Sequence, residues 1–247
     1  MKKIACIPAR YDSSRLKGKL LLDLGGKTII ERVAEAVNGF KGFDEVVVLT
    51  DHELIAEAVS NIEVQCIMTS TDCNSGTERL ISVLPQLEGD IIINVQGDEP
   101  FINNDHLESI LGLMEDEAVS IGTLCHKIQD NEHLFNYNHV KVVFNKLNRA
   151  LYFSRQAIPA IRDEMYKDWI LKYPYYRHIG IYGYKRAALE KIGLMKGSEL
   201  EDAEKLEQLK WMDNGLDIHV KEVIDPPITG IDTDADYERA RQYLSNS

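Results

Sequence analysis

A dense group of cations follows the first apolar run of the chain. Residues 8–19 read Pro-Ala-Arg-Tyr-Asp-Ser-Ser-Arg-Leu-Lys-Gly-Lys, with four positive side chains within ten positions. Arginine offers phosphate a planar fork of donors, and lysine a compact point charge. This pattern favours a triphosphate ligand over the plainer interpretation, a solvated basic loop. It is not a Walker A loop, because GxxxxGKS and GxxxxGKT are absent. The residues concerned are Pro8, Ala9, Arg10, Arg15, Lys17 and Lys19.

Two acidic segments could supply ligands for Mg²⁺. Asp98 follows an apolar run directly, after Gly97, which would let the backbone approach a ligand. Asp232 lies in a Gly-Ile-Asp-Thr-Asp sequence much further along. Mg²⁺ takes hard oxygen ligands and shares them with substrate phosphates, so two carboxylates distant in sequence suit it. The plainer interpretations are a turn around Asp98 and a helix capped by Thr233 or Asp234.

Small polar residues between positions 69 and 79 could recognise a base. They join an apolar run to the start of a predicted helix, where exposed backbone groups can pair with a base edge. Arg79 could orient this loop, whereas Ser75 or Thr77 could simply cap the helix. The candidates for contact with the nucleotide are Ser70, Asn74, Ser75, Gly76, Arg79 and Gln96.

A further set of polar residues could surround a polyhydroxylated acid. Arg155 could pair with a carboxylate and His178 with a hydroxyl, although a lone histidine in an apolar strand is more often satisfied within the core. Positions 201, 204 and 208 share one face of a predicted helix, and such acidic faces are commonly solvated. The candidates are Arg155, His178, Tyr182, Glu204 and Gln208.

The elements that must position these residues alternate regularly in the first hundred residues. The run 3–8 is apolar without polar alternation, which is typical of a central parallel strand. We therefore predict an open α/β sheet, which binds ligands beyond the carboxyl ends of its strands. The pattern predicts strands at 3–8, 45–49, 64–68 and 90–95, and helices at 28–37, 52–59 and 76–84.

After residue 124 the alternation becomes looser. We predict strands at 140–144, 150–153 and 178–184, and a lid or dimer arm in the Pro- and Tyr-rich segment 159–176. Ser198 opens a helix through a Ser-x-x-Glu capping box, and Asn214-Gly215 closes it. Because no linker or repeat interrupts the sequence, we expect one domain over 1–247, with a sugar-binding or dimerisation insertion at about 130–180.

Composition narrows the class of protein. The 247 residues carry a formal net charge of -12, which opposes non-specific binding to nucleic acid or anionic membranes. Four cysteines without a CxxC pair support neither a zinc site nor a redox motif. The first apolar run is too short for a signal peptide or a membrane span, so we expect a cytoplasmic protein.

Eight segments, in order and over nearly the whole chain, resemble the signature of the CMP-KDO synthetases, the 3-deoxy-manno-octulosonate cytidylyltransferases. Each segment alone is a loose match, but the set in this order is specific. The segments are Ile7 to Arg10, Ser14-Arg15-Leu16 with Gly18-Lys19, Ser75 to Arg79, Val95 to Pro100, Tyr152 to Arg155, His178 to Tyr182, Leu206 to Leu209 and Gly230 to Thr233.

The resemblance implies the nucleotide-diphospho-sugar transferase fold, a Rossmann-like three-layer α/β fold with a mixed sheet, usually as a homodimer. It implies a nucleotidyltransferase that joins CTP to KDO, an acidic ulosonic sugar, and feeds lipopolysaccharide or capsule assembly. The resemblance also implies roles for single residues. The triphosphate would be held by Arg10, Arg15 and Lys19, and Mg²⁺ by Asp98 and Asp232. Ribose or cytosine would be contacted by Ala9, Ser70, Ser75, Gly76 and Gln96. The sugar would be surrounded by Arg155, His178, Tyr182, Glu204 and Gln208. Arg10, Lys19, Asp98 and Asp232 would carry the catalysis.

Two departures from the family pattern bear on function. Lys17 and Leu20 replace prolines of the usual R-L-P-G-K-P-L, which loosens the loop backbone. Asp202 replaces the glutamine of L-E-Q-I-E, so an ammonium-bearing sugar such as 8-amino-KDO is an alternative substrate. Because one fold serves many functions, a glycosyltransferase, a uridylyl- or guanylyltransferase, and a non-catalytic nucleotide-binding regulator are also compatible with it.

Overall fold

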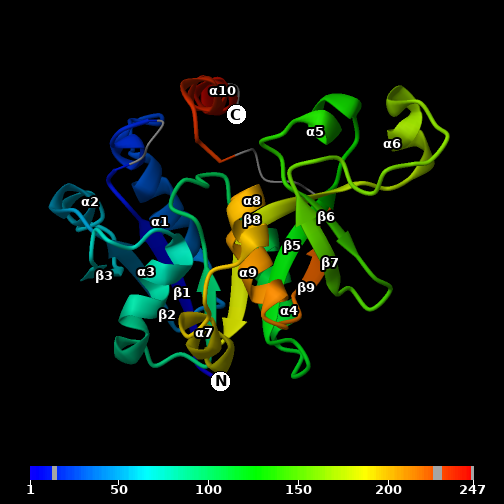
Figure 1. Ribbon diagram of the computed structural model, residues 1–247. Helices are drawn as coiled ribbons and strands as arrows, with labels where there is room; N and C mark the ends of the chain where they lie inside the picture. The colour runs from blue at the N-terminus through cyan, green and yellow to red at the C-terminus, as the bar shows by residue number, and fades with distance from the viewer. Residues whose placement is uncertain (13–15, 225–229, 246–247) are drawn as a thin grey trace. The chain divides into compact units, whose positions relative to one another are not determined.

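The computed structural model describes residues 1–12, 16–224 and 230–245. Arg15, one of the predicted triphosphate ligands, therefore lies outside the described residues. The chain forms two compact units, Met1–Leu111 with Pro227–Ser247, and Gly112–Pro226. The predicted insertion at 130–180 lies within the second unit, and a single domain over 1–247 stays a prediction. Helices and strands carry the labels of Figure 1.

The first unit contains a parallel sheet in the order β3-β2-β1-β4. Strand β1 (Lys3–Ala9) pairs with β2 (Glu45–Thr50) on one side and with β4 (Ile91–Asn94) on the other. Strand β3 (Gln65–Met68) pairs with β2. Because β1 is covered on both faces, its residues from Ile4 to Ile7 are fully buried. The prediction of a parallel α/β sheet is confirmed.

Helices connect these strands in the order that the sequence predicts. Helix α1 (Ile29–Gly39) begins with a capping box, in which Thr28 and Glu31 satisfy each other's backbone N–H groups. Helices α2 (Glu53–Ala58) and α3 (Gly76–Val83) follow, capped by His52 and Ser75. Of the two predicted caps for α3, Ser75 is therefore the correct one. The first unit also includes η1 (Lys19–Leu21), η2 (Leu84–Gln86) and α10 (Asp234–Ser245), and α4 spans Asn104–Met114.

The second unit contains a mixed sheet, as expected. Strand β5 (Ile121–Lys127) is antiparallel to β8 (Tyr176–Lys185) and parallel to β9 (His219–Glu222). Strands β6 (Lys141–Phe144) and β7 (Ala150–Ser154) form an antiparallel pair, and β6 also contacts β8. The helices of this unit before the α8 and α9 region are α5 (Asn131–Phe135), η3 (Tyr166–Asp168), α6 (Trp169–Lys172) and α7 (Arg186–Gly193).

The Pro- and Tyr-rich segment 159–176, here called the arm, shares a small hydrophobic core with residues that follow β5. Trp169 and Tyr175 pack there with Ile128 and Leu134. The Tyr175 hydroxyl donates to the carbonyl of Pro159 at 2.8 Å, which ties the two ends of the arm together. The arm also contacts α5, because the ring centroids of Phe135 and Trp169 are 5.9 Å apart; Figure 1 labels α5 and α6.

The prediction of one continuous helix from Ser198 to Asn214 is wrong. The structure has two helices, α8 (Glu199–Glu204) and α9 (Glu207–Asp213), because Lys205 adopts a left-handed conformation with φ of 52°. Ser198 caps α8 through the N–H of Leu200 rather than through a capping box with Glu201. Residues 201, 204 and 208 therefore do not form one face of a single helix.

No helix in the described part of the chain combines the length and apolarity that crossing a membrane requires.

Candidate active site

The cation loop, residues 8–19, is held at its base by the backbone of Tyr11. The Tyr11 N–H donates to Asp51 at 2.9 Å, and the Tyr11 carbonyl accepts from the N–H of Gly18 at 3.2 Å. The Tyr11 ring stacks on His52 with ring centroids 3.9 Å apart. Gly18 has φ of +65°, which glycine adopts without strain. Lys19 therefore directly follows a residue whose backbone is bonded to Tyr11.

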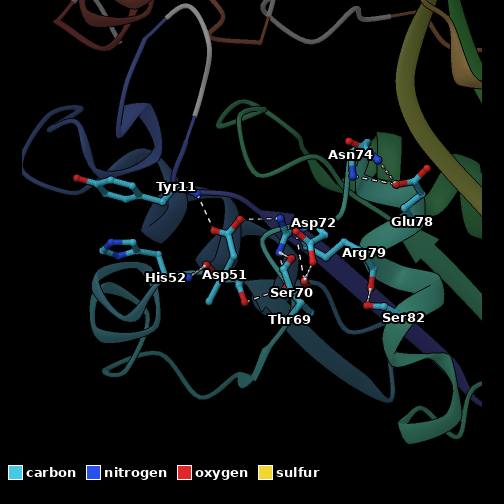
Figure 2. A network of polar contacts seen from close by, with 11 residues as sticks. Tyr11, Asp51, His52, Thr69, Ser70, Asp72, Asn74, Glu78, Arg79 and Ser82 are labelled. Carbon is cyan, nitrogen blue, oxygen red and sulfur yellow. Dashed lines mark hydrogen bonds and ion pairs between the residues drawn. The ribbon is translucent and has the colours of Figure 1, made fainter.

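Arg79 connects three loops at the carboxyl end of the sheet, as Figure 2 shows. Its side chain is only 2% exposed and pairs with Asp51 at 2.8 Å. It also donates to the hydroxyl of Thr69 and the carbonyl of Ser70. Because Asp51 also accepts from Tyr11, the ends of β2 and β3 are tied to the cation loop. Arg79 thus orients the loop that begins at Thr69, as predicted. These contacts use most of the N–H groups of its guanidinium.

A polar pocket of about 260 Å³ lies in the first unit. It brings together most of the predicted nucleotide and metal residues. Two of the predicted residues do not line it: Ala9 is fully buried, and Ser70 donates its hydroxyl to Asp72. Leu20 and Cys73 do line it; the only signal for them in the sequence is adjacency to Lys19 and Asn74. The lining is Pro8, Arg10, Lys19, Leu20, Cys73, Asn74, Ser75, Gly76, Arg79, Gln96, Gly97, Asp98 and Asp232.

Two glycines allow the walls of this pocket to approach closely. A Cβ at Gly97 would lie 2.9 Å from the carbonyl oxygen of Pro8, and a Cβ at Gly76 would lie 2.9 Å from the Pro8 ring. Both distances are shorter than a side chain tolerates. The ends of β1 and β4 and the start of α3 therefore meet around Pro8.

Asp98 and Asp232 come together around a single cation. The ammonium of Lys19 lies 2.6 Å from the Asp98 carboxylate and 2.9 Å from that of Asp232. A hydrogen bond of 2.9 Å from the Ile231 N–H to the Asp98 carbonyl fixes the two segments together. Burial lowers the pKa of Lys19, but the two carboxylates outweigh burial and raise that pKa above its usual value.

The neighbouring Thr233 has a separate, structural role. Its hydroxyl accepts from the N–H of Asp236 at 3.2 Å, and the Asp236 carboxylate accepts from the N–H of Thr233 at 2.8 Å. This reciprocal pair caps α10, so Thr233 rather than Asp234 is the N-cap. Asp232 is not the helix cap.

In the second unit, Arg155 and Glu204 form one assembly. The Glu204 carboxylate accepts from the Ser154 hydroxyl at 2.6 Å and from the Arg155 N–H at 3.0 Å. The Arg155 guanidinium donates to the carbonyls of Glu204 at 2.8 Å and Lys205 at 3.4 Å. Since a guanidinium carries five N–H groups, Arg155 retains donors for an anionic ligand. The Glu204 carboxylate, by contrast, is engaged with the end of β7.

His178 and Tyr182 lie together on β8, with ring centroids 5.2 Å apart. His178 bonds to Thr123 at 2.9 Å, and burial with the nearby Arg177 lowers its pKa to about 3, so the ring is neutral. Tyr182 is 3% exposed, and its hydroxyl has no hydrogen-bond partner among the described residues. A buried hydroxyl of this kind is suited to a ligand. Gln208 is buried near the start of α9.

Comparison with known proteins identifies the class first. The cytidylyltransferase family model matches residues 4–218. The fold is also that of a cytidylyltransferase from Leptospira borgpetersenii, at 19% identity and a TM-score of 0.65 over 100% of this chain and 88% of that one. These matches define a nucleotidyltransferase fold of the cytidylyltransferase type.

Proteins with higher sequence identity to this chain identify its family within that class. The 3-deoxy-manno-octulosonate cytidylyltransferase of Parabacteroides distasonis is 42% identical, over 100% of this chain and 99% of its own. That of Idiomarina loihiensis is 43% identical over 96% of both chains. A solved structure of CMP:2-keto-3-deoxy-manno-octonic acid synthetase complexed with CTP has a TM-score of 0.92 at 41% identity, covering 100% and 99% of the two chains. The chain therefore belongs to the 3-deoxy-manno-octulosonate cytidylyltransferase family.

Proposed function

We propose that the protein transfers the cytidylyl group of CTP to KDO and releases pyrophosphate. The anomeric hydroxyl of the sugar loses its proton and forms a bond to the α-phosphorus, while the bond from that phosphorus to the bridging oxygen breaks. The products are CMP-KDO and pyrophosphate. The observation that carries the proposal is the polar pocket in which Lys19 and the carboxylates of Asp98 and Asp232 meet, in a chain related over its full length to enzymes of this name.

The pocket suits a triphosphate because it gathers cations at its wall. Arg10 is exposed there and can present its guanidinium to phosphate oxygens. Lys19 is held by Asp98 and Asp232, and its raised pKa keeps it protonated in the neutral range. Most of the acceleration in such transfers comes from positioning and charge neutralisation. A non-catalytic regulator would have no use for two carboxylates gathered beside these cations.

The residues at the pocket also fit Mg²⁺. Asp98 and Asp232 offer hard carboxylate oxygens, and their joint contact with the Lys19 ammonium supports a site in which both carboxylates reach one cation. No group of three or more His, Cys, Asp or Glu side chains forms a metal cage within the described ranges. Two carboxylates are appropriate for an ion that takes its other ligands from phosphate and water. When bound, Mg²⁺ would neutralise charge on the phosphates.

The second unit supplies the residues that suit the sugar acid. We assign the remaining N–H groups of Arg155 to the carboxylate and the hydroxyl of Tyr182 to a sugar hydroxyl. We propose plain KDO rather than 8-amino-KDO as the substrate. The Asp202 carboxylate is 79% exposed and already pairs with Lys205 at 3.3 Å, so an added ammonium would gain little from it.

We also propose that the enzyme acts in the cytoplasm, where nucleoside triphosphate is available, and that it feeds lipopolysaccharide or capsule assembly. A homodimer is proposed because the arm and its surroundings expose large apolar side chains: Phe135, Tyr137, Met165, Tyr166 and Leu171.

A pyrophosphate-release assay tests the proposed reaction. Each of the four nucleoside triphosphates is combined with KDO, 8-amino-KDO and related ulosonic acids, with Mg²⁺ or with a chelator. We expect turnover with CTP and KDO, and none after chelation. Preference for 8-amino-KDO would contradict the assignment of the sugar, and nucleotide binding without pyrophosphate release would contradict the enzyme itself.

A further inference from the structure

Lys141 is a fully buried lysine that the proposed reaction does not use. It lies at the start of β6 and is 0% exposed. Its ammonium donates to three backbone carbonyls: those of Asn136 at 3.0 Å, His139 at 2.5 Å and Arg155. An ammonium has three N–H groups, so these carbonyls use all of them. Burying such a charge is costly, which calls for a reason beyond packing.

The third carbonyl belongs to the residue that we assign to the sugar carboxylate. Glu204 binds the same short segment from the other direction, through the Ser154 hydroxyl and the Arg155 N–H. Lys141 is also paired in register with Ser154 across the β6–β7 ladder. The backbone of Arg155 is therefore held at its carbonyl by a cation and at its N–H by a carboxylate. Its side chain projects from a backbone that is fixed on both sides.

We propose that Lys141 is a positioning residue for the sugar acid, which fixes the backbone of Arg155 so that its guanidinium meets the substrate carboxylate. This inference rests on the proposed function, because it presumes that Arg155 binds the sugar. Charged hydrogen bonds are stronger than neutral ones, so the ammonium restrains this segment more firmly than a neutral group would. The lining residues of the nucleotide pocket all belong to the first unit, whereas Lys141 belongs to the second.

The surroundings of Lys141 make its effect dependent on pH. Burial lowers the pKa of Lys141 from 10.5 to about 8. The charge of Glu204 opposes this decrease, and the charges of Arg155 and Arg177 add to it. The pKa of the adjacent His139 is lowered to about 4 by burial, so that ring stays neutral above pH 7. As pH rises through about 8, Lys141 loses a proton, and the neutral amine has only two N–H groups for three carbonyls. Binding of the sugar should weaken in this range.

Protein stability moves in the opposite direction. Between pH 8 and 10.5 the unfolded chain binds the proton that the folded chain has lost. The contribution of Lys141 to the free energy of unfolding therefore rises with pH in this window. Weaker sugar binding at alkaline pH consequently cannot be attributed to this residue destabilising the fold.

The test compares Lys141→Met with Lys127→Met and with the unchanged protein. Lys127 is exposed at the end of β5 in the same unit, so its replacement is matched in charge and shape. KM for KDO, KM for CTP and kcat are measured between pH 7 and 9.5. For Lys141→Met we expect KM for KDO to rise about tenfold with KM for CTP nearly unchanged, because only the sugar site loses its restraint. The rise of KM for KDO with pH should persist in Lys127→Met and disappear in Lys141→Met.

Three results would overturn the inference. They are an unchanged KM for KDO in folded Lys141→Met, equal losses for KDO and CTP, or a KM for KDO in the unchanged protein that is flat through pH 8. The last measurement needs no variant, so the inference stays testable if Lys141→Met does not fold. Failure of the proposed function is a different outcome, in which the unchanged protein releases no pyrophosphate from CTP and KDO.

Discussion

At the scale of single residues, the site depends on bringing two like charges together. Asp98 and Asp232 would repel each other if no cation lay between them, and the ammonium of Lys19 relieves this repulsion. The backbone hydrogen bond from Ile231 to Asp98 sets the separation of the two segments. Replacing either carboxylate should therefore affect catalysis much more than folding.

The variant Asp232→Asn tests this expectation. The amide keeps the shape of the side chain but loses the charge that would hold a divalent ion, so we expect kcat to fall by about a hundredfold or more. The unfolding midpoint should change little, because Asp232 is exposed. Asp234→Asn is the matched control, since Asp234 is exposed in the first turn of α10 and is not the helix cap. Rates of pyrophosphate release that are similar in the two variants would show that Asp232 has no role in catalysis.

At the scale of elements, one buried ion pair holds the loops around the pocket. Arg79 on α3 and Asp51 after β2 are 2% and 9% exposed at their side chains, and through them the cation loop is tied to the strand ends (Figure 2). Removing one partner of such a buried pair is strongly destabilising, because the other partner stays buried with an unpaired charge. Replacing both partners by apolar residues costs much less.

We expect Asp51→Ala to lower the free energy of unfolding by about 3 kcal/mol and to raise KM for CTP, because Arg79 remains buried and the base of the cation loop is released. Denaturant unfolding and initial-rate kinetics measure the two effects. Glu238→Ala is the control: it removes a surface pair with Arg241 whose side chains are more than half exposed, and should cost less than about 0.5 kcal/mol. Equal costs for the two variants would show that the buried pair has no special role.

Local signals in the sequence account for much of the first unit. The four strands and three helices for which bounds were predicted there begin and end within a residue or two of those bounds, because apolar runs and caps such as Thr28 are local features. Helix α4 was not predicted. The break between α8 and α9 has no such signal: the sequence around Lys205 consists of good helix formers. The carbonyls of Glu204 and Lys205 accept from Arg155, some fifty residues earlier, and this tertiary contact accompanies the left-handed turn.

The residues of the candidate site also divide into those that local sequence signals predict and those that depend on tertiary contacts. Gln96 and Asp98, which follow the end of β4, were predictable from the order of the elements, and Lys19 from the group of cations after β1. The burial of Arg79 depends on Asp51, a residue from another loop, and the engagement of Glu204 with Ser154 joins segments fifty residues apart. Sequence patterns indicate which residues are polar, but not which of them form hydrogen bonds or ion pairs with one another.

At the scale of the whole molecule, the exposed apolar side chains of the arm bear on the proposed homodimer. Leu171 in α6 is 79% exposed and lies near the exposed Tyr166 and Met165 in sequence. Large exposed apolar side chains can mark an interaction surface. A charge in place of Leu171 should oppose its burial against a second copy.

Sedimentation equilibrium should give twice the mass of one chain for the unchanged protein, and a shift towards a single chain for Leu171→Asp. Leu194→Asp provides the control, because Leu194 is 87% exposed after α7, outside the arm. A monomeric unchanged protein, or dissociation by both substitutions, would contradict a dimer formed through the arm.

The hydrogen bond between Ile231 and Asp98 also bears on incomplete synthesis of the protein. A polypeptide that terminates anywhere between residues 112 and 230 contains the whole cation loop and all four strands of the first unit, but neither Ile231 nor the second carboxylate. Premature stop codons in this range should therefore yield fragments that lack the paired carboxylates and release no pyrophosphate from CTP and KDO.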